Sequence, residues 1–184
     1  PAEFEIDRIP GAVNIPIFDN EERKAIGILY KESRDKAFNL GYAWYQEKMP
    51  HFTEAFSKFK EKQVVVYCWR GGMRSKAMTE LALQLGVKAY QLDGGYKQYR
   101  CYVRDTLYNY EPPYRFIVLY GFAGCGKTDL IKRLSPSIDL EGCAQHRSSL
   151  FGHIGLRPNS QKRFESLLLG QLKDAEGNPY VFIE

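Results

Sequence analysis

One short stretch of the chain, Val64-Val-Val-Tyr-Cys-Trp-Arg-Gly-Gly-Met-Arg-Ser75, indicates the fold class. Its first five residues form a β-branched, apolar run of the length of a buried strand. An amphipathic helical pattern follows from Ser75 to Leu85 and ends at Gly86. A second short strand over 89–92 leads to Asp93-Gly-Gly95 and another helix. Strands that alternate with helices in this way predict a parallel α/β sheet.

Cys68 ends the first of these strands, at the position where parallel α/β sheets bind ligands. The residues after it can turn their backbone N–H groups inward as an anion-binding nest, because glycine tolerates the angles that such a turn needs. The helix that begins near Ser75 directs its positive end at the same point, and these effects together stabilise a thiolate. We therefore predict that Cys68 is a catalytic nucleophile. The predicted anion-binding residues are Arg70, Gly71, Gly72, Met73, Arg74 and Ser75.

The length of this loop indicates the size of its ligand. Five residues separate Cys68 from Arg74, one more than in many simple sulfurtransferases. The same spacing occurs in cysteine-dependent phosphatases, so the loop predicts an anion about the size of phosphate. The sequence assigns no aspartate as the general acid that a phosphatase needs. The remaining cysteines, Cys101, Cys125 and Cys143, are interpreted as structural thiols, because no comparable features surround them.

A glycine-rich motif follows a second apolar strand, which is expected over 116–120. The sequence Gly121-Phe-Ala-Gly-Cys-Gly-Lys-Thr128 fits the pattern G-x-x-x-x-G-K-[ST] and opens a helix expected over 127–134. Lys127 supplies positive charge to a bound phosphate, and Thr128 can ligate Mg²⁺. The predicted diphosphate-binding residues are Gly121, Gly124, Cys125, Gly126, Lys127 and Thr128. The candidates for an acid that holds the metal are Glu184, at the end of a strand over 180–183, and Asp139 and Glu141.

A polar loop after this motif is a further candidate for substrate binding. It contains Asp139, Glu141, His146 and Arg147. Its composition fits either a substrate loop or side chains that cap a helix or face solvent. The histidines do not have a metal-ligand spacing to other good ligands, so we predict no metal site built from them.

Two prolines in Asn109-Tyr-Glu-Pro-Pro113 forbid a continuous helix and predict a domain boundary, with domains over 1–110 and 114–184. Further helices are expected over 21–30, 35–47 and 161–172, with a short one that carries Phe52, Phe56 and Phe59. The chain begins on Pro1 and stops directly after an apolar run. We therefore expect it to be part of a longer protein.

The composition is that of a soluble globular protein, with 44% hydrophobic and 26% charged residues among 184. Disorder throughout and a collagen-like fibre are excluded. The 26 Lys and Arg residues against 22 Asp and Glu give a net charge of +4, which permits nucleic-acid binding without requiring it. No apolar run reaches the ~18 residues of a membrane span, and the N-terminus lacks a signal-peptide pattern. Four cysteines without a Cys-x-x-Cys pair favour reduced thiols and a cytoplasmic location.

The Cys68 loop resembles that of rhodanese domains, together with Asp93-Gly-Gly95 downstream and Ile9-Pro-Gly-Ala-Val-Asn-Ile-Pro16 upstream. In such domains the loop cysteine carries sulfur as a persulfide. The resemblance also implies a first strand with an Asp-x-Arg pattern, which would lie just before Pro1 and is missing from this sequence.

The order of motifs along essentially the whole chain resembles the tRNA 2-selenouridine synthase family. The rhodanese-like loop is followed by Gly94-Gly-Tyr-Lys97, the glycine-rich motif, Asp139-Leu-Glu-Gly142, His146-Arg147 and Ser160-Gln-Lys-Arg-Phe-Glu165. The implied fold is a rhodanese-like domain followed by a P-loop NTPase-like α/β domain. The implied activity converts wobble 2-thiouridine of tRNA to 2-selenouridine with selenophosphate, through a geranylated intermediate made from geranyl diphosphate.

The resemblance also implies roles for particular residues. Cys68 would receive or direct selenium, and Lys127 and Thr128 would bind the geranyl diphosphate, with Mg²⁺ as an optional ion and no tightly bound cofactor. The expected partners are tRNA, the selenium donor and the isoprenyl diphosphate, without a membrane. Two basic stripes are candidates for binding tRNA, although each fits a solvated helix face equally well. They consist of Lys97, Arg100 and Arg104, and of Lys132, Arg133 and Arg147.

Other functions fit parts of the same pattern. A rhodanese sulfurtransferase fused to a P-loop kinase or NTPase would turn over ATP. A binding module would use both loops to hold RNA, and its function would survive Cys68→Ser. A cysteine phosphatase would hydrolyse a simple aryl phosphate.

Overall fold

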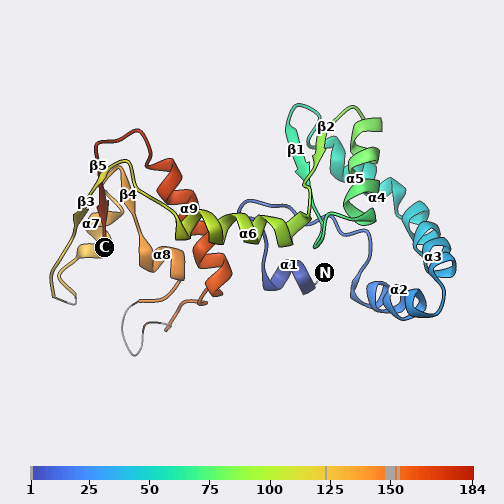
Figure 1. The fold of residues 1–184 in the computed structure, drawn as a ribbon, viewed down its shortest axis with the longest axis horizontal. Coiled ribbons are helices and arrows are strands. Elements are labelled where there is room, and N and C mark those ends of the chain that lie inside the picture. The colour runs from blue at the N-terminus through green and yellow to red at the C-terminus, as the bar shows by residue number, and fades with distance from the viewer. Residues whose placement is uncertain (1, 123, 148–151, 153) are drawn as a thin grey trace. The chain divides into compact units, whose positions relative to one another are not determined.

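The chain folds into two compact units, Pro1–Tyr99 and Arg100–Glu184. A computed structural model describes residues 2–122, 124–147, 152 and 154–184 (Figure 1). From β1 onward, one or two helices separate successive strands, and the strand pairs are parallel. The prediction of a parallel α/β fold is therefore confirmed.

The first unit is built on a two-stranded parallel sheet of β1 (Gln63–Val66) and β2 (Lys88–Gln91). In its register Val64 pairs with Ala89 and Val66 with Gln91, so both strands end at the same edge. The helices of this unit are α1 (Ala2–Ile6), α2 (Asn20–Glu32), α3 (Arg34–Glu47), α4 (Met49–Ser57), α5 (Met73–Gln84) and the start of α6 (Gly95–Tyr108).

The ends of these helices follow local capping rules. Asp19 and Glu22 form a capping box at the start of α2, because each side chain accepts the other residue's backbone N–H. Ser33 ends α2 and its hydroxyl accepts the Lys36 N–H at the start of α3. Gly86, at φ +81°, ends α5 in the left-handed conformation that glycine adopts without strain.

The core of the first unit lies between the sheet and the helices α4 and α5, which flank the strands in Figure 1. Burial of these apolar side chains is the main force that holds the sheet in place, and thereby the loop that leaves β1. The buried residues are Ile17, Phe52, Phe56, Met78, Leu81, Ala82, Val87 and Ala89.

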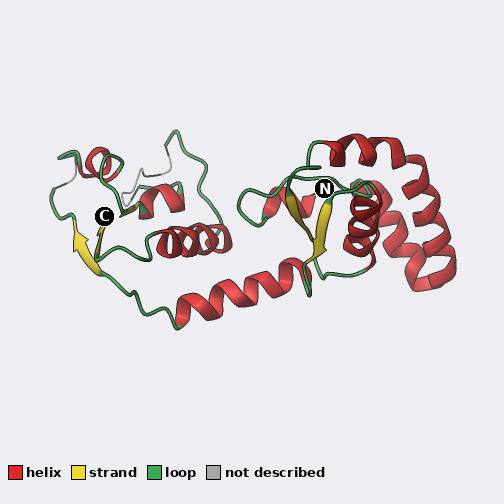
Figure 2. Cartoon of the chain, turned by 90° about the horizontal axis from the view of Figure 1, so that it is seen from above, coloured by secondary structure: helices red, strands yellow, loops and turns green. Residues whose placement is uncertain are grey.

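The second unit contains a three-stranded parallel sheet in the order β3-β5-β4. Its strands, yellow in Figure 2, are β3 (Arg115–Val118), β4 (Ser137–Ile138) and β5 (Tyr180–Ile183). The helices are α7 (Lys127–Ile131), α8 (Leu140–Ala144) and α9 (Gln161–Asp174). Its buried core consists of Tyr114, Ile138, Leu172, Ala175 and Val181.

The two compact units divide between Tyr99 and Arg100, inside α6, and the domain boundary expected at the two prolines stays a prediction. Arg100 explains this division, because its guanidinium donates to the Lys162 carbonyl at 2.9 Å and pairs with the Glu165 carboxylate. Burial alone would raise the pKa of Glu165, but hydrogen bonds from Arg100 and Gln161 hold it below its usual value. The later turns of α6 are thereby fastened to α9.

Several element boundaries differ from the sequence predictions. The first strand ends at Val66 rather than Cys68, since the Cys68 carbonyl accepts the Tyr96 N–H instead of a strand bond. Helix α7 ends at Ile131, three residues before the predicted end. The sequence did not predict α1, β4 or α8, which have only two to five residues each. Within the described parts of the chain, no helix has the length and apolar character to cross a membrane.

Candidate active site

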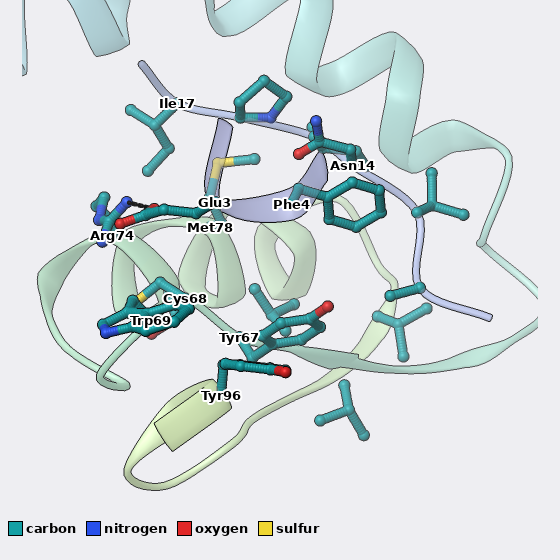
Figure 3. A pocket seen from close by; sticks show the side chains of 18 of the residues that line it. Glu3, Phe4, Asn14, Ile17, Tyr67, Cys68, Trp69, Arg74, Met78 and Tyr96 are labelled. Atoms are coloured by element: carbon teal, nitrogen blue, oxygen red, sulfur yellow. Dashed lines mark hydrogen bonds and ion pairs between the residues drawn. The ribbon is translucent and has the colours of Figure 1, made fainter. Parts of the chain in front are cut away.

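Cys68 lies between β1 and α5 (Figure 3), and its half-buried thiol is close to several hydrogen-bond donors. Its Sγ lies 3.3 Å from the Ser75 Oγ. Burial alone would raise the pKa of this thiol, but the Ser75 hydroxyl and the backbone N–H groups of Arg70, Ser75 and Gly72 outweigh it. The pKa of Cys68 consequently lies below its ordinary value, and the structure favours the thiolate.

The Asp93-Gly-Gly95 turn packs directly against the Cys68 loop, so these two separate sequence signals form one structure. The Tyr96 N–H donates to the Cys68 carbonyl at 2.9 Å, and the Lys97 N–H donates to the Trp69 carbonyl at 3.0 Å. A Cβ on Gly71 would lie 2.8 Å from the Gly95 nitrogen, closer than real Cβ atoms approach. Glycine is therefore required where the loop and the turn meet, and Gly71 itself has φ +67°.

The positive charge at this site comes from more residues than the loop alone. Arg74 Nη1 lies 3.2 Å from Glu3 Oε2, the contact drawn as a dashed line in Figure 3, and Arg23 Nη1 lies 2.7 Å from Glu3 Oε1. Arg23 and Lys24 of α2 line an open pocket of about 740 Å³ with Cys68, Arg70, Gly72, Met73 and Arg74. Four of the six predicted anion-binding residues, all except Gly71 and Ser75, thus line a pocket whose walls also include the Glu3 carboxylate and two cations of α2.

A second hollow, of about 310 Å³, shares Cys68, Trp69 and Arg74 with this pocket. Its other walls are largely apolar and come from 11–18, 64–67 and the helices α1, α4 and α5. Trp69 and Tyr96 pack with their ring centroids 5.1 Å apart at its edge. The thiol therefore lies between a basic opening and an apolar interior.

The glycine-rich loop of the second unit brings Lys127, Thr128 and Glu184 together. Lys127 Nζ donates to the carbonyls of Gly121 and Phe122, both at 3.1 Å, and lies 3.9 Å from Glu184 Oε1. The Thr128 hydroxyl donates to Glu184 Oε1 at 3.3 Å. Gly124 and Gly126 have φ values of +78° and +86°, which explains glycine at both positions. Ala123 lies outside the described residues, and Cys125 is exposed.

Among the three candidate acids, only Glu184 is shown next to Thr128. The Asp139 carboxylate instead accepts the Gly142 N–H at 2.7 Å and caps α8. Glu141 lies in α8, where its carbonyl accepts the His146 N–H. The Arg147 side chain is exposed, and residues 148–151 and 153 of the predicted substrate loop lie outside the described residues.

Arg100 was a candidate member of a basic stripe for binding nucleic acid, but the structure does not place it on such a stripe. Its side chain is only 14% exposed and is occupied by Glu165, Lys162 and Ser166. Lys97 and Arg104 remain exposed, as do Lys132 and Arg133 of the other predicted stripe. Among the described residues, no group of three or more His, Cys, Asp or Glu side chains is arranged to hold a metal.

Comparison with known protein families agrees with the two loops that the structure shows, a cysteine loop and a glycine-rich loop. The model of the rhodanese-like domain matches residues 1–100, so the chain belongs to the rhodanese-like family. Residues 114–184 match the model of the tRNA 2-selenouridine synthase AAA domain. These two matches, in this order, agree with the resemblance to the tRNA 2-selenouridine synthase family.

Individual relatives show the same similarity to tRNA 2-selenouridine synthases. The tRNA 2-selenouridine synthase of Hydrogenovibrio crunogenus is 39% identical over 181 residues, covering 91% of this chain and 49% of that protein. The synthase of Shewanella pealeana is 36% identical over 172 residues, covering 91% of this chain and 47% of that protein. The chain thus spans about half the length of the curated relatives it matches.

One solved structure is also similar. It is described as the N-terminal domain of an ATP/GTP binding protein from Clostridium difficile 630. It has a TM-score of 0.53 and 37% sequence identity, and the match covers 55% of this chain and 81% of that one.

Proposed function

We propose that this chain carries two active loops of an enzyme that converts wobble 2-thiouridine of tRNA to 2-selenouridine with selenophosphate. The observation that supports this most strongly is the Cys68 thiol, held by inward N–H groups at a basic pocket in a relative of the tRNA 2-selenouridine synthases. The loop and pocket suit a small tetrahedral dianion with one reactive atom.

The proposed first reaction takes place at the glycine-rich loop. The sulfur of 2-thiouridine attacks the first carbon of geranyl diphosphate, the sulfur–carbon bond forms, and the carbon–oxygen bond breaks. The diphosphate leaves with the bonding electrons, and Lys127 and Thr128 compensate its growing negative charge. This role suits Lys127, whose Nζ now contacts only carbonyl oxygens, the Cys125 sulfur and the Glu184 carboxylate within the described residues.

Mg²⁺ fits the same loop. The Thr128 hydroxyl and the Glu184 carboxylate would hold it, and Glu184 Oε2 is buried without a hydrogen-bond partner among the described residues. When bound, the ion would neutralise charge on the diphosphate.

The proposed second reaction takes place at Cys68, which directs selenium. Its thiolate attacks the phosphorus of selenophosphate, a phosphorus–sulfur bond forms, and the phosphorus–selenium bond breaks to release hydrogen selenide ion. Arg74 and the loop N–H groups hold the phosphoryl oxygens. Selenide then displaces geranylthiolate from the base, and water hydrolyses the cysteine-bound phosphoryl group to phosphate, which restores the thiol.

Nucleoside mass spectrometry tests this function. 2-Thiouridine tRNA would be incubated with selenophosphate and geranyl diphosphate, and with the parent chain, Cys68→Ser or Lys127→Ala. We expect 2-selenouridine from the parent, accumulation of geranylated thiouridine with Cys68→Ser, and little geranylation with Lys127→Ala. Seleno product from Cys68→Ser at the parental rate would refute the role of Cys68, and an unchanged geranylation rate would refute that of Lys127.

The tRNA partner is part of the same proposal. Exposed cations surround the Cys68 pocket, including Lys24 and Arg70, and can contact the phosphate backbone. We expect tRNA binding to weaken steeply with rising salt, measured by filter binding or fluorescence anisotropy. A flat salt dependence would contradict this electrostatic mode of binding.

A second candidate function is NTP hydrolysis in the glycine-rich loop, linked to sulfur transfer at Cys68. The contact between Thr128 and Glu184 favours it, since this pairing suits Mg²⁺ with a nucleotide as well as with a prenyl diphosphate. Phosphate release from ATP or GTP by the purified chain, abolished by Lys127→Ala, would support this alternative.

A further inference from the structure

Gln91 is the last residue of β2 and reaches the Cys68 loop from the neighbouring strand. It pairs in register with Val66, the last residue of β1, which lies two positions before Cys68. Its Nε2 lies 2.7 Å from the Gly71 carbonyl oxygen and 3.1 Å from Ser75 Oγ. Gln91 therefore contacts both the loop backbone and the side chain next to the thiol.

The orientation of the Gln91 amide follows from its partners. The carbonyl oxygens of Gly71 and Gly72 can only accept hydrogen bonds, so the amide nitrogen, not the oxygen, must face them. One Nε2 hydrogen is directed at Gly71, and the other is available for Ser75 Oγ. Gln91 is thus a donor to the Ser75 hydroxyl.

This donation determines what the Ser75 hydroxyl can do for Cys68. A hydroxyl has a single hydrogen, and Ser75 Oγ lies 3.0 Å from the Gly72 carbonyl and 3.3 Å from Cys68 Sγ. The Gly72 carbonyl also accepts the Lys76 N–H at 3.1 Å, so it keeps a partner when the Ser75 hydrogen turns to the sulfur. Ser75 is almost fully buried, which removes water as a competing partner.

We propose that Gln91 is a positioning residue for Cys68, which by donating to Ser75 Oγ leaves that hydroxyl to donate its hydrogen to the Cys68 thiolate. Its bond to the Gly71 carbonyl also holds that oxygen toward β2, while the loop N–H groups face the sulfur. The inference rests on the proposed function only in that Cys68 acts as a thiolate.

The test measures the reactivity of Cys68 itself. The rate of iodoacetamide alkylation would be followed from pH 5 to 10 in the whole chain, with Cys68 resolved from the other cysteines by peptide mass spectrometry. The variants are Gln91→Ala, Gln91→Glu, Ser75→Ala and the double variant Gln91→Ala with Ser75→Ala. Gln84→Ala, at the exposed end of α5, is the matched control. None of them alters a charged group that lines either hollow with the thiol, and these groups are Glu3, Asp7, Arg23, Lys24, Arg70 and Arg74.

At pH values below the inflection of the rate profile, we expect Gln91→Ala to slow alkylation about three- to tenfold, which is the range of one neutral hydrogen bond. The plateau of the rate at high pH should stay unchanged. Gln91→Glu should slow it more, since a carboxylate cannot donate to Ser75 and adds negative charge. Gln84→Ala should change nothing. In the Ser75→Ala background, the effect of Gln91→Ala should disappear.

Three outcomes would overturn the proposal, and the first two concern the effect of the Gln91 variants on the pH profile. One is an unshifted inflection in both Gln91 variants, and the other is an undiminished effect of Gln91→Ala when Ser75 is already Ala. A lowered plateau would show a general loss of the loop structure and would equally contradict a positioning role. Because alkylation requires neither selenophosphate nor tRNA, its result is independent of whether the chain forms 2-selenouridine.

Discussion

The close approach of Gly95 to the Cys68 loop predicts a severe effect of Gly95→Ala. The new Cβ would meet the Cys68 carbonyl oxygen and the Gly71 nitrogen well inside 3.0 Å, a separation that real Cβ atoms essentially never show. Both are backbone atoms of the loop, so no side-chain rotation can relieve the overlap. Gly95 also has φ +58°, in the left-handed region that alanine disfavours. The substitution therefore combines two costs.

The size of each cost can be assigned from the structure. The left-handed backbone costs an alanine about 1–2 kcal/mol. The overlap forces a backbone shift, which by analogy with overpacked cores costs a further 1–3 kcal/mol or so. We expect Gly95→Ala to lower the free energy of unfolding of the first unit by about 2–5 kcal/mol, a large part of the ~5–15 kcal/mol of a typical domain.

Two other glycines separate these contributions. Gly86 has φ +81° but nothing within 4 Å of its would-be Cβ, so Gly86→Ala should show the backbone cost alone. Gly27 lies in α2 with open space around it, and Gly27→Ala should stabilise by about 0.5–1 kcal/mol through helix propensity. Urea unfolding of the chain, followed by tryptophan fluorescence, would compare all three. The reasoning is refuted if Gly95→Ala costs no more than Gly86→Ala.

Further predictions concern the second unit and the thiols. Arg100→Met should destabilise the second unit by about 1.5–3 kcal/mol at pH 7, measured by thermal unfolding. Because the pKa of Glu165 is lowered in the folded state, its contribution is present above the unfolded pKa, and the penalty of Arg100→Met should shrink as the pH falls below about 4. At pH 7.5 iodoacetamide should modify Cys68 long before Cys143, whose burial raises the pKa to about 11, and peptide mass spectrometry would show comparable rates if this is wrong. Thr128→Val should weaken any Mg²⁺-dependent binding of geranyl diphosphate several-fold in calorimetry, and equal affinity would remove Thr128 from the ion site.

The parts of the fold that sequence reasoning predicted are those encoded within a few neighbouring residues. The apolar run before Cys68, the glycines after it and the helix that ends before Gly86 are determined locally, so their pattern is visible in the sequence. The glycine-rich motif before Lys127 is readable for the same reason. Short elements such as β4 and α8 escaped prediction, because they depend on packing against β5 and α9 rather than on their own periodicity.

The residues that complete the Cys68 site could not be predicted, because no local pattern connects them. Arg23 precedes Cys68 by 45 positions and reaches the pocket only through the path of α2. Gln91 reaches Ser75 across the pairing of β1 and β2, and one step in that register would turn its side chain to the other face. The assignment of Arg100 to a basic stripe failed for a related reason, since helical spacing does not reveal the carboxylate of Glu165.

The Cys68 loop and the glycine-rich loop each lie between a strand and a helix, but they differ in where positive charge lies. This difference bears on the reaction proposed for each loop. At Cys68, cations and the Glu3 carboxylate line an open pocket around a thiol that accepts hydrogen bonds from the loop N–H groups, so the proposed nucleophile and the proposed anion site coincide. At the glycine-rich loop the Lys127 ammonium contacts carbonyl oxygens, the Cys125 sulfur and the Glu184 carboxylate. The first arrangement suits attack by a thiolate, whereas the second suits stabilisation of negative charge on a departing group. This difference matches the two proposed reactions, in which Cys68 attacks the selenium donor and Lys127 compensates the charge of the departing diphosphate.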